Sequence, residues 1–331
     1  MRSRFPWRGY SGKLAFSVAI FINIILPVFG LILIGYIAGH TSVLPALAVR
    51  GLANAATYLM IPVLLFRSVV GDGTVPSWEP GIVLSYFSGC LLILVLGLIL
   101  GRLLFKLSLD QLGVFGMASM YSNAALLGLP LIQTAFGASG VILQMKIIAF
   151  HSLILLPVTT MVIAMGRGQP GGPMKLIWPA VRDTVSNPII IGIAGGLLWS
   201  LTGLGIWGPL DKMTAMLSAA ASPTALIALG AALAQSTIRV GHELLEAMTV
   251  SVLKLAVHPV IVWVLTAKIA GLSPEAVIVA TVTAGLPAGA NVYLQAHQFG
   301  VYVEGAVNAV MLTTLLSVIS ITLILALLHP V

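Results

Sequence analysis

Two short stretches place polar residues, glycine and proline inside otherwise apolar runs. Tyr121–Pro130 reads Tyr-Ser-Asn-Ala-Ala-Leu-Leu-Gly-Leu-Pro, and Ala284–Tyr293 reads Ala-Gly-Leu-Pro-Ala-Gly-Ala-Asn-Val-Tyr. Proline removes a backbone donor and displaces the carbonyl four residues earlier, and nearby glycines lower the cost of unwinding a helix. Because both stretches contain Gly-Leu-Pro, we expect two helices that break in the same way.

A broken helix at membrane depth exposes backbone groups that must line a cavity or be buried in protein. The N-terminal end of a half-helix favours anions, and exposed carbonyls favour cations. Asn123 and Asn291 add side-chain donors and acceptors beside the breaks. The alternative for both amides is hydrogen bonding between helices of a bundle. The candidate substrate-binding residues are Ser122, Asn123, Gly128, Pro130, Pro287, Gly289 and Asn291.

Four ionisable side chains also lie within apolar runs, namely Lys146, His151, Lys254 and His258. Charges at this depth are costly and mark functional sites, so all four are candidates for charge or proton coupling. Lys254 and His258 are four residues apart and share one helix face. The lysines could instead extend to the membrane interface, and the histidines could be structural hydrogen-bond partners.

The acidic residues are distributed differently. All nine Asp and Glu residues lie at the edges of apolar runs or between them. A carrier of cations would need buried carboxylates, as would a sodium site built from side chains. Lysine, histidine and amides instead favour a small organic anion as substrate, with protons or no coupling ion at all.

Composition identifies the surroundings in which this chemistry takes place. The chain has 331 residues, of which 59% are hydrophobic and 8% charged. Soluble domains carry about 25% charged residues, so the chain is predicted to be an integral membrane protein made of helices. The net charge of +7 comes mainly from loops and the N-terminal tail, which indicates membrane topology rather than binding to nucleic acid.

We expect an all-α protein with about ten membrane spans, since each span needs about 20 residues. The predicted spans are 16–38, 47–70, 81–105, 111–136, 139–165, 186–203, 210–235, 241–270, 275–298 and 303–328. They divide the chain into a basic tail at 1–15, a five-helix repeat at 16–165, a polar loop at 166–185 and a second five-helix repeat at 186–331.

The two halves share a pattern. The second span of each half has a mid-helix proline, Pro62 or Pro223, and the fourth span of each has Gly-Leu-Pro. An odd number of spans per half inverts one half relative to the other, which is the inverted-repeat architecture of secondary carriers. The alternative is that proline and glycine are simply frequent in membrane helices. Lysine and arginine in the loops favour a cytoplasmic 166–185 loop, with both termini outside.

Other functions leave weaker signals. Gly137-Ala-Ser-Gly140 is similar to the nucleophile motif of rhomboid intramembrane proteases, but a serine nucleophile needs a base within reach. An anion channel is a further alternative, although nothing resembles a repeated filter sequence. The chain has no Walker loop, dinucleotide fingerprint, His-Glu-x-x-His or cysteine pair, so we expect no enzyme, cofactor or metal site.

Residues Ser122–Leu131 and Gly285–Tyr293 resemble the auxin efflux carrier family, and in particular its bacterial branch of permeases for malonate, malate and related organic acids. Further stretches agree with this resemblance in the same order along the chain. They are Leu59–Phe66, Asn187–Gly192, Ser222–Gly230 and Lys254–Pro259.

The resemblance implies ten helices in a five-plus-five inverted repeat, with a scaffold part and a transport part. It implies that the broken fourth and ninth helices cross, and that the substrate carboxylate binds near the crossing. Asn123, Pro130, Pro287 and Gly289 match the motif residues of these two helices. Val292 stands where plant members have a further proline, so auxin is not implied as the substrate.

These observations together predict a secondary carrier that moves small mono- or dicarboxylates by alternating access. Its partners are the substrate anion and the lipid bilayer of the cell (inner) membrane. Protons as the coupling ion and a homodimer remain open.

Overall fold

The computed structural model describes residues 18–19, 21–71, 79–168, 178, 182, 186–237 and 239–328. The basic tail predicted at 1–15 and most of the polar loop predicted at 166–185 lie outside these residues.

The described chain is built from helices, several of which contain a π-helical turn, labelled η. The first half comprises η1 Phe21–Ile25, α2 Leu26–His40, α3 Ala46–Ala55, η2 Ala56–Met60, α4 Ile61–Val70, α5 Pro80–Phe105, α6 Leu109–Met120, η3 Ala124–Gly128 and α7 Leu129–Arg167. The second half comprises α9 Pro188–Leu201, α10 Gly208–Ala234, α11 His242–Val252, η4 Leu253–Val257, α12 His258–Trp263, η5 Val264–Ile269, α13 Pro274–Ala284, α14 Ala290–Phe299 and α15 Val303–Leu328.

Among the described residues, seven helical stretches are long and apolar enough to cross a membrane, and the protein is therefore a multi-pass membrane protein. The difference from ten predicted spans arises where helices are short or interrupted. The predicted sixth span is the 14-residue α9, and the ninth is divided into α13 and α14. The predicted fourth and fifth spans are joined through α7, which has a non-helical residue at Gly137.

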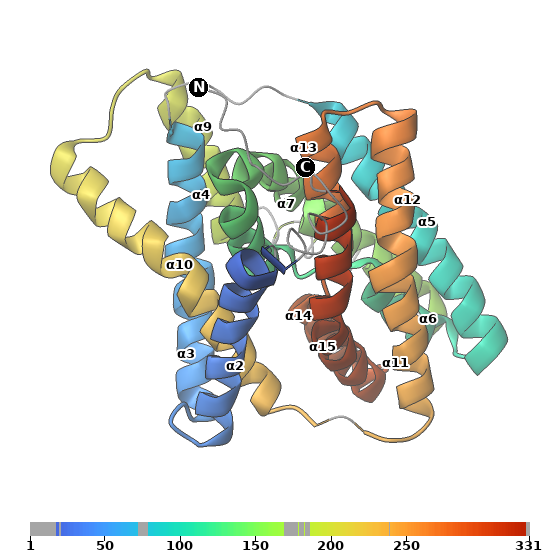
Figure 1. Cartoon of the computed structure of the whole chain (residues 1–331). Coiled ribbons are helices and arrows are strands. Elements are labelled where there is room, and N and C mark those ends of the chain that lie inside the picture. The colour runs from blue at the N-terminus through green and yellow to red at the C-terminus, as the bar shows by residue number, and fades with distance from the viewer. Residues whose placement is uncertain are drawn as a thin grey trace.

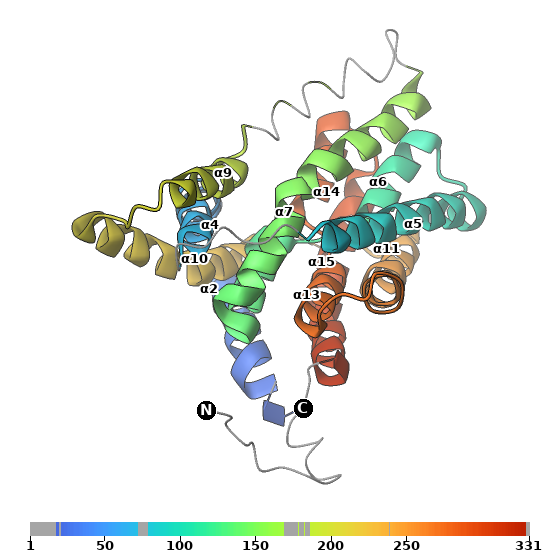
Figure 2. The same cartoon turned by 90° about the horizontal axis from the view of Figure 1, so that it is seen from above.

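The helices form two groups, each with segments from both halves of the chain (Figure 1). We call α2, α3, α4, α9 and α10 the first helix group, because α10 packs on α2, α3 and α4, and α4 packs on α9. The second helix group contains α5, α6 and α11–α15, in which α5 packs on α6 and α11 packs on α15. Seen from above, α7 runs between the two groups (Figure 2).

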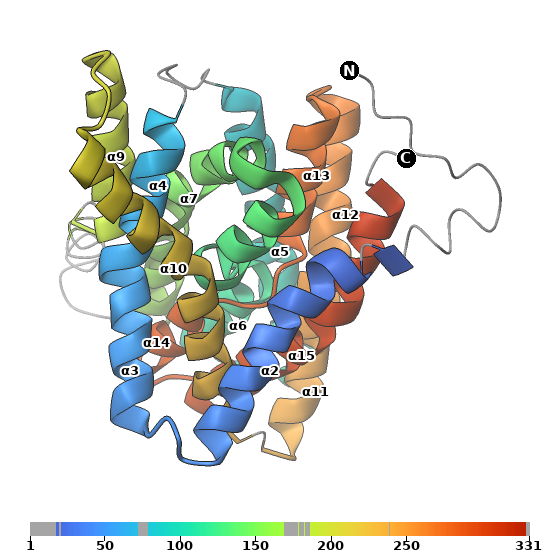
Figure 3. The same cartoon turned by 60° about the vertical axis from the view of Figure 1, so that its left-hand side comes forward.

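Close packing of α2 on α10 holds the first helix group together (Figure 3). Gly35 of α2 lies directly against the backbone of Ile227, and Gly230 of α10 lies against the backbone of Ile32. Small residues let membrane helices approach closely, and here a side chain at either glycine would meet main-chain atoms that cannot rotate away.

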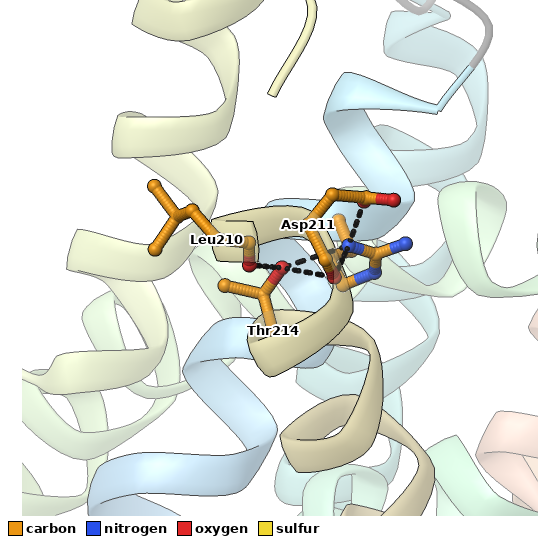
Figure 4. Close-up of polar contacts among 4 residues, drawn as sticks. Leu210, Asp211 and Thr214 are labelled. Carbon is orange, nitrogen blue, oxygen red and sulfur yellow. Dashed lines mark hydrogen bonds and ion pairs between the residues drawn. The ribbon is translucent and has the colours of Figure 1, made fainter. Parts of the chain in front are cut away.

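A polar clamp ties α4 to the start of α10. The Arg67 guanidinium donates hydrogen bonds to the Asp211 carbonyl at 2.9 Å and to Thr214 Oγ1 at 2.7 Å, and it pairs with the Asp211 carboxylate. Figure 4 shows Asp211 and Thr214 in the first turns of α10, with their oxygens directed to one guanidinium, that of Arg67.

The close approach of α2 and α10 gives a testable prediction. Gly35→Ala should destabilise the protein by about 1–3 kcal/mol, because the added methyl group overpacks the Ile227 backbone. The measurement is thermal unfolding in detergent. Gly30→Ala on the same helix is the matched control, since nothing lies within 4 Å of its Cβ position. Equal unfolding temperatures for the two variants would contradict the assigned packing.

Candidate functional site

The centre of the molecule contains two interruptions that face each other. The first break is 121–123, between α6 and η3, and the second break is 285–289, between α13 and α14. The Asn123 amide donates to the Pro287 carbonyl at 2.9 Å, and the Gly289 amide donates to the Tyr121 carbonyl at 3.0 Å. Each break therefore supplies the hydrogen-bond partners that the other has lost, which the lipid surroundings cannot provide.

Side chains of two further helices also form hydrogen bonds with the backbone at the breaks. Gln144 of α7 donates from Nε2 to the Ala124 carbonyl at 2.8 Å, and Thr313 of α15 accepts from the Ala288 amide at 3.0 Å. A side chain at Gly289 would be tightly packed, because its Cβ atom would lie 3.1 Å from the Ser122 carbonyl oxygen and from the Tyr121 ring. Of the other predicted residues, Pro287 accepts from the Asn123 amide, Gly128 donates to the Asn123 carbonyl at 3.0 Å, and Pro130 lies in the first turn of α7.

A cavity of about 300 Å³ lies beside the breaks. Of the predicted site residues, the structure brings Ser122, Asn123, His151, Gly289 and Asn291 to its wall. The remaining wall comes from the two helix groups and α7, with these lining residues: Ala53, Asn54, Thr57, Tyr58, Tyr121, Ala124, Ala125, Leu126, Ile148, Ser152, Asn187, Ile189, Ile190, Ala290 and Leu294.

Hydrogen bonds between side chains order one side of this cavity. Asn291 donates from Nδ2 to the Tyr121 hydroxyl at 2.6 Å, and the same hydroxyl lies 2.7 Å from Ser152 Oγ. The Tyr121 ring stands edge-on to His151, with 4.3 Å between ring centroids. Asn291 is therefore anchored by Tyr121, which leaves its amide oxygen and second N–H for a ligand.

The electrostatics of the cavity favour an anion. Three helical segments begin at it, because Asn187 is the N-cap of α9, Asn123 precedes η3 and α7, and Gly289 is the N-cap of α14. Helix N-termini carry partial positive charge and free N–H groups. Among the described residues that line the cavity, none is an aspartate or glutamate.

Behind the first break lies a buried polar cluster that contains two of the predicted coupling residues in direct contact. Lys254 donates from Nζ to Ser122 Oγ at 2.9 Å and to the Ala284 carbonyl at 2.5 Å, and it lies 3.3 Å from His258 Nδ1. Tyr86 joins the cluster to His151, since its hydroxyl donates to Ser122 Oγ at 3.0 Å and lies 3.4 Å from His151 Nε2.

The fourth predicted coupling residue lies elsewhere. Lys146 is buried on α7 but forms an ion pair at 3.3 Å with Glu79, which precedes α5. It neither lines the cavity nor contacts the Lys254 cluster in the part of the chain that the structure describes. The ion pair explains why a lysine is stable at this point of the helix.

The serine of the rhomboid-like motif does not meet a histidine. Ser139 donates to the Phe136 carbonyl at 3.0 Å and lies 2.6 Å from the Glu275 carboxylate, and its side chain is exposed. Gly137 in the same motif has φ of 62° and bends α7. The motif therefore forms the turn between two halves of α7, and the hydrogen bonds of the described residues show no nucleophile–base pair.

Sequence reasoning did not single out Asn54, Asn187, Tyr121 and Ser152 as wall residues. Asn187 had a usable signal, since asparagine immediately before proline is a favoured helix N-cap, and its side chain does accept from the Ile189 amide at 2.9 Å. Tyr121 is the first residue of the stretch Tyr121–Pro130, so its position beside Ser122 and Asn123 was a usable signal. Asn54 and Ser152 lie in apolar runs, where only the packing decides which face meets a cavity.

The fold and this cavity define a helical, multi-pass membrane protein with a central polar site. Comparison with known proteins identifies its family. The membrane transport protein family matches the chain over residues 20–175 and again over residues 173–325. The chain therefore belongs to this family of membrane transport proteins, the auxin efflux carrier family that its motifs resemble.

One relative extends the comparison to nearly the whole chain. A protein of Rhizobium meliloti (strain 1021), described as "Putative malonate transporter", is 26% identical over 301 residues. The similarity covers 91% of this chain and 93% of that protein.

The contact between the breaks gives a second prediction. Gly289→Ala should lower the free energy of unfolding by about 1–3 kcal/mol, because its methyl group pushes against the Ser122 carbonyl and the Tyr121 ring. Thermal unfolding in detergent measures this effect. Gly51→Ala, where nothing lies within 4 Å of the added atom, is the control. Unfolding of Gly289→Ala at the wild-type temperature would show that the two breaks are not packed together.

Proposed function

We propose that this protein is a secondary carrier for small organic anions, with mono- and dicarboxylates as the substrate class. The observation that carries the proposal is the cavity at the paired breaks, lined by amides and helix N-termini and by no carboxylate among its described residues. Membership of the membrane transport protein family supports transport as the activity.

The size of the cavity favours a small substrate. Pockets for small molecules range from about 300 to 1,000 Å³, and this cavity of about 300 Å³ is at the lower end. Because the Rhizobium relative is described as "Putative malonate transporter", malonate is the first candidate to test.

The proposed binding mode uses both breaks. Asn123 and Asn291 donate side-chain hydrogen bonds to the carboxylate oxygens of the substrate, and the first-turn amides of α14 add backbone donors. Hydrogen bonds to a charged group are stronger than those between neutral groups. The fold thus positions these hydrogen-bond donors before the substrate binds and replaces water.

The proposed transport mechanism is alternating access. In this proposal the helices form a five-plus-five inverted repeat in which the broken fourth and ninth helices cross. On one side, residues of α3 and α9 from the first helix group line the cavity, and on the other side the two breaks line it. Movement of the second helix group and α7 against the first would therefore open the cavity first to one side of the membrane and then to the other.

Coupling and location complete the proposal. The carrier works in the cell (inner) membrane with lipid as its surroundings, driven by the membrane potential or by protons. His151 and His258 are the candidate proton-linked groups, because an imidazole can carry a proton on either ring nitrogen. A homodimer is compatible with this mechanism and is not required by it.

The direct test is uptake by the purified protein in liposomes. We expect saturable uptake of labelled malonate, and faster uptake when the liposomes are loaded with unlabelled malonate, because a carrier returns more rapidly with substrate bound. An ionic current that rises linearly with malonate concentration, without acceleration by unlabelled malonate inside the liposomes, would favour a channel. Absence of uptake for every mono- and dicarboxylate offered would contradict the proposal.

Two amide variants test the site. Asn123→Ala and Asn291→Ala should each lower uptake about tenfold or more, because a hydrogen bond to a charged group contributes about 1.5–3 kcal/mol. Asn23→Ala is the matched control, since Asn23 is exposed and bonds to the Ala19 carbonyl of its own helix. Uptake at the wild-type rate by both variants would show that Asn123 and Asn291 do not bind the substrate.

A further inference from the structure

Lys254 occupies an unusual position for a lysine. It lies in η4, in the middle of the helical stretch His242–Ile269, and its side chain is fully buried. Its ammonium group therefore does not reach the membrane interface. Instead it donates to the carbonyl of Ala284, the last residue of α13.

The end of α13 is a place where a cation is stabilised. The C-terminal end of a helix carries partial negative charge, and carriers use the C-terminal ends of half-helices and unwound carbonyls to coordinate sodium ions or protons. In this protein the Lys254 ammonium lies at such an end, beside the second break. A side chain thus occupies the position that a coupling cation would otherwise take.

Three polar atoms surround the Lys254 nitrogen. It donates to the Ala284 carbonyl at 2.5 Å and to Ser122 Oγ at 2.9 Å, and His258 Nδ1 lies 3.3 Å away. The titratable groups of the surrounding cluster are Tyr86 and Cys90 from α5, His151 from α7 and His258 from its own helix. No carboxylate pairs with Lys254 in the described ranges, so its charge lacks a negative partner until an anion binds nearby.

Ser122 connects this charge with the cavity. Its oxygen accepts hydrogen bonds from both Lys254 at 2.9 Å and Tyr86 at 3.0 Å, which occupies both lone pairs. Its own hydrogen has no acceptor among the hydrogen bonds of the described residues, and Ser122 lines the cavity. A hydroxyl that accepts two hydrogen bonds, one of them from a cation, becomes a stronger donor.

We propose that Lys254 is the resident cation of this carrier: it stands in the place of a coupling sodium ion, and through Ser122 it strengthens a hydrogen bond to the carboxylate of the bound anion. This inference rests on the proposed function. Lys254 is a positioning residue, since it acts on the substrate through Ser122 and does not touch it.

The first experiment replaces sodium in the wild-type assay. Malonate uptake is measured in liposomes with sodium or with N-methylglucamine as the only added cation, at the same pH and membrane potential. Equal initial rates are expected because the cation position is already occupied. Uptake that requires sodium would overturn the inference while leaving anion transport intact.

The second experiment is a double-mutant cycle on the Michaelis constant KM for malonate. Lys254→Met and Ser122→Ala should each raise KM about tenfold or more, since both weaken the same donor to a charged group. Because Lys254 acts through Ser122, adding Lys254→Met to Ser122→Ala should raise KM by less than about twofold. The matched control is Lys146→Met, which removes a buried lysine that pairs with Glu79, and its KM should stay near the wild-type value.

Each outcome has a distinct meaning. An equal effect of Lys254→Met in both backgrounds, or an unchanged KM, would assign Lys254 only a structural role at the end of α13. If Lys254→Met fails to fold, the sodium replacement and the KM of Ser122→Ala still test the inference. An unchanged KM for Ser122→Ala would contradict the proposed role of Ser122 as a donor to the substrate. Absence of any uptake by the wild-type protein would instead contradict the proposed function.

Discussion

The backbone hydrogen bonds between the two breaks are the constraint on which the rest of the structure depends. The Asn123 amide with the Pro287 carbonyl and the Gly289 amide with the Tyr121 carbonyl join chain segments that are more than 150 residues apart. A bilayer offers no partners to an unwound backbone, and each unsatisfied group costs several kcal/mol. Neither break is stable without the other, so the halves of the chain must assemble around this contact.

The paired breaks also create the polarity of the site. Where a helix stops at the centre of the protein, its end carries partial charge that must be neutralised or used. The negative end of α13 is neutralised by Lys254, whose ammonium bonds to the Ala284 carbonyl. The positive start of α14 remains open at the cavity, where Gly289 and Asn291 lie. In the proposed mechanism, the same geometry holds the Lys254 ammonium inside the protein and leaves the start of α14 for the substrate anion.

The sequence predicted a membrane protein and the location of both breaks. Proline and glycine act on the local backbone, so their effect can be recognised from a short motif. It could not separate Lys146 from Lys254, since both are lysines in apolar runs. Only the fold shows that Lys146 meets Glu79, whereas Lys254 meets Ser122. Asn54 was missed for the same reason, because the face of α3 that meets the cavity is decided by packing.

The central claim is that the cavity at the breaks opens alternately to the two sides of the membrane. Its most direct test labels Leu294→Cys, a cavity-lining position, in a Cys90→Ala background that removes the single native cysteine. A membrane-impermeant thiol reagent is added to one side or the other of oriented vesicles, with and without malonate. We predict labelling from both sides and a lower rate with malonate present. Labelling from one side only, unaffected by any carboxylate, would contradict alternating access at this site.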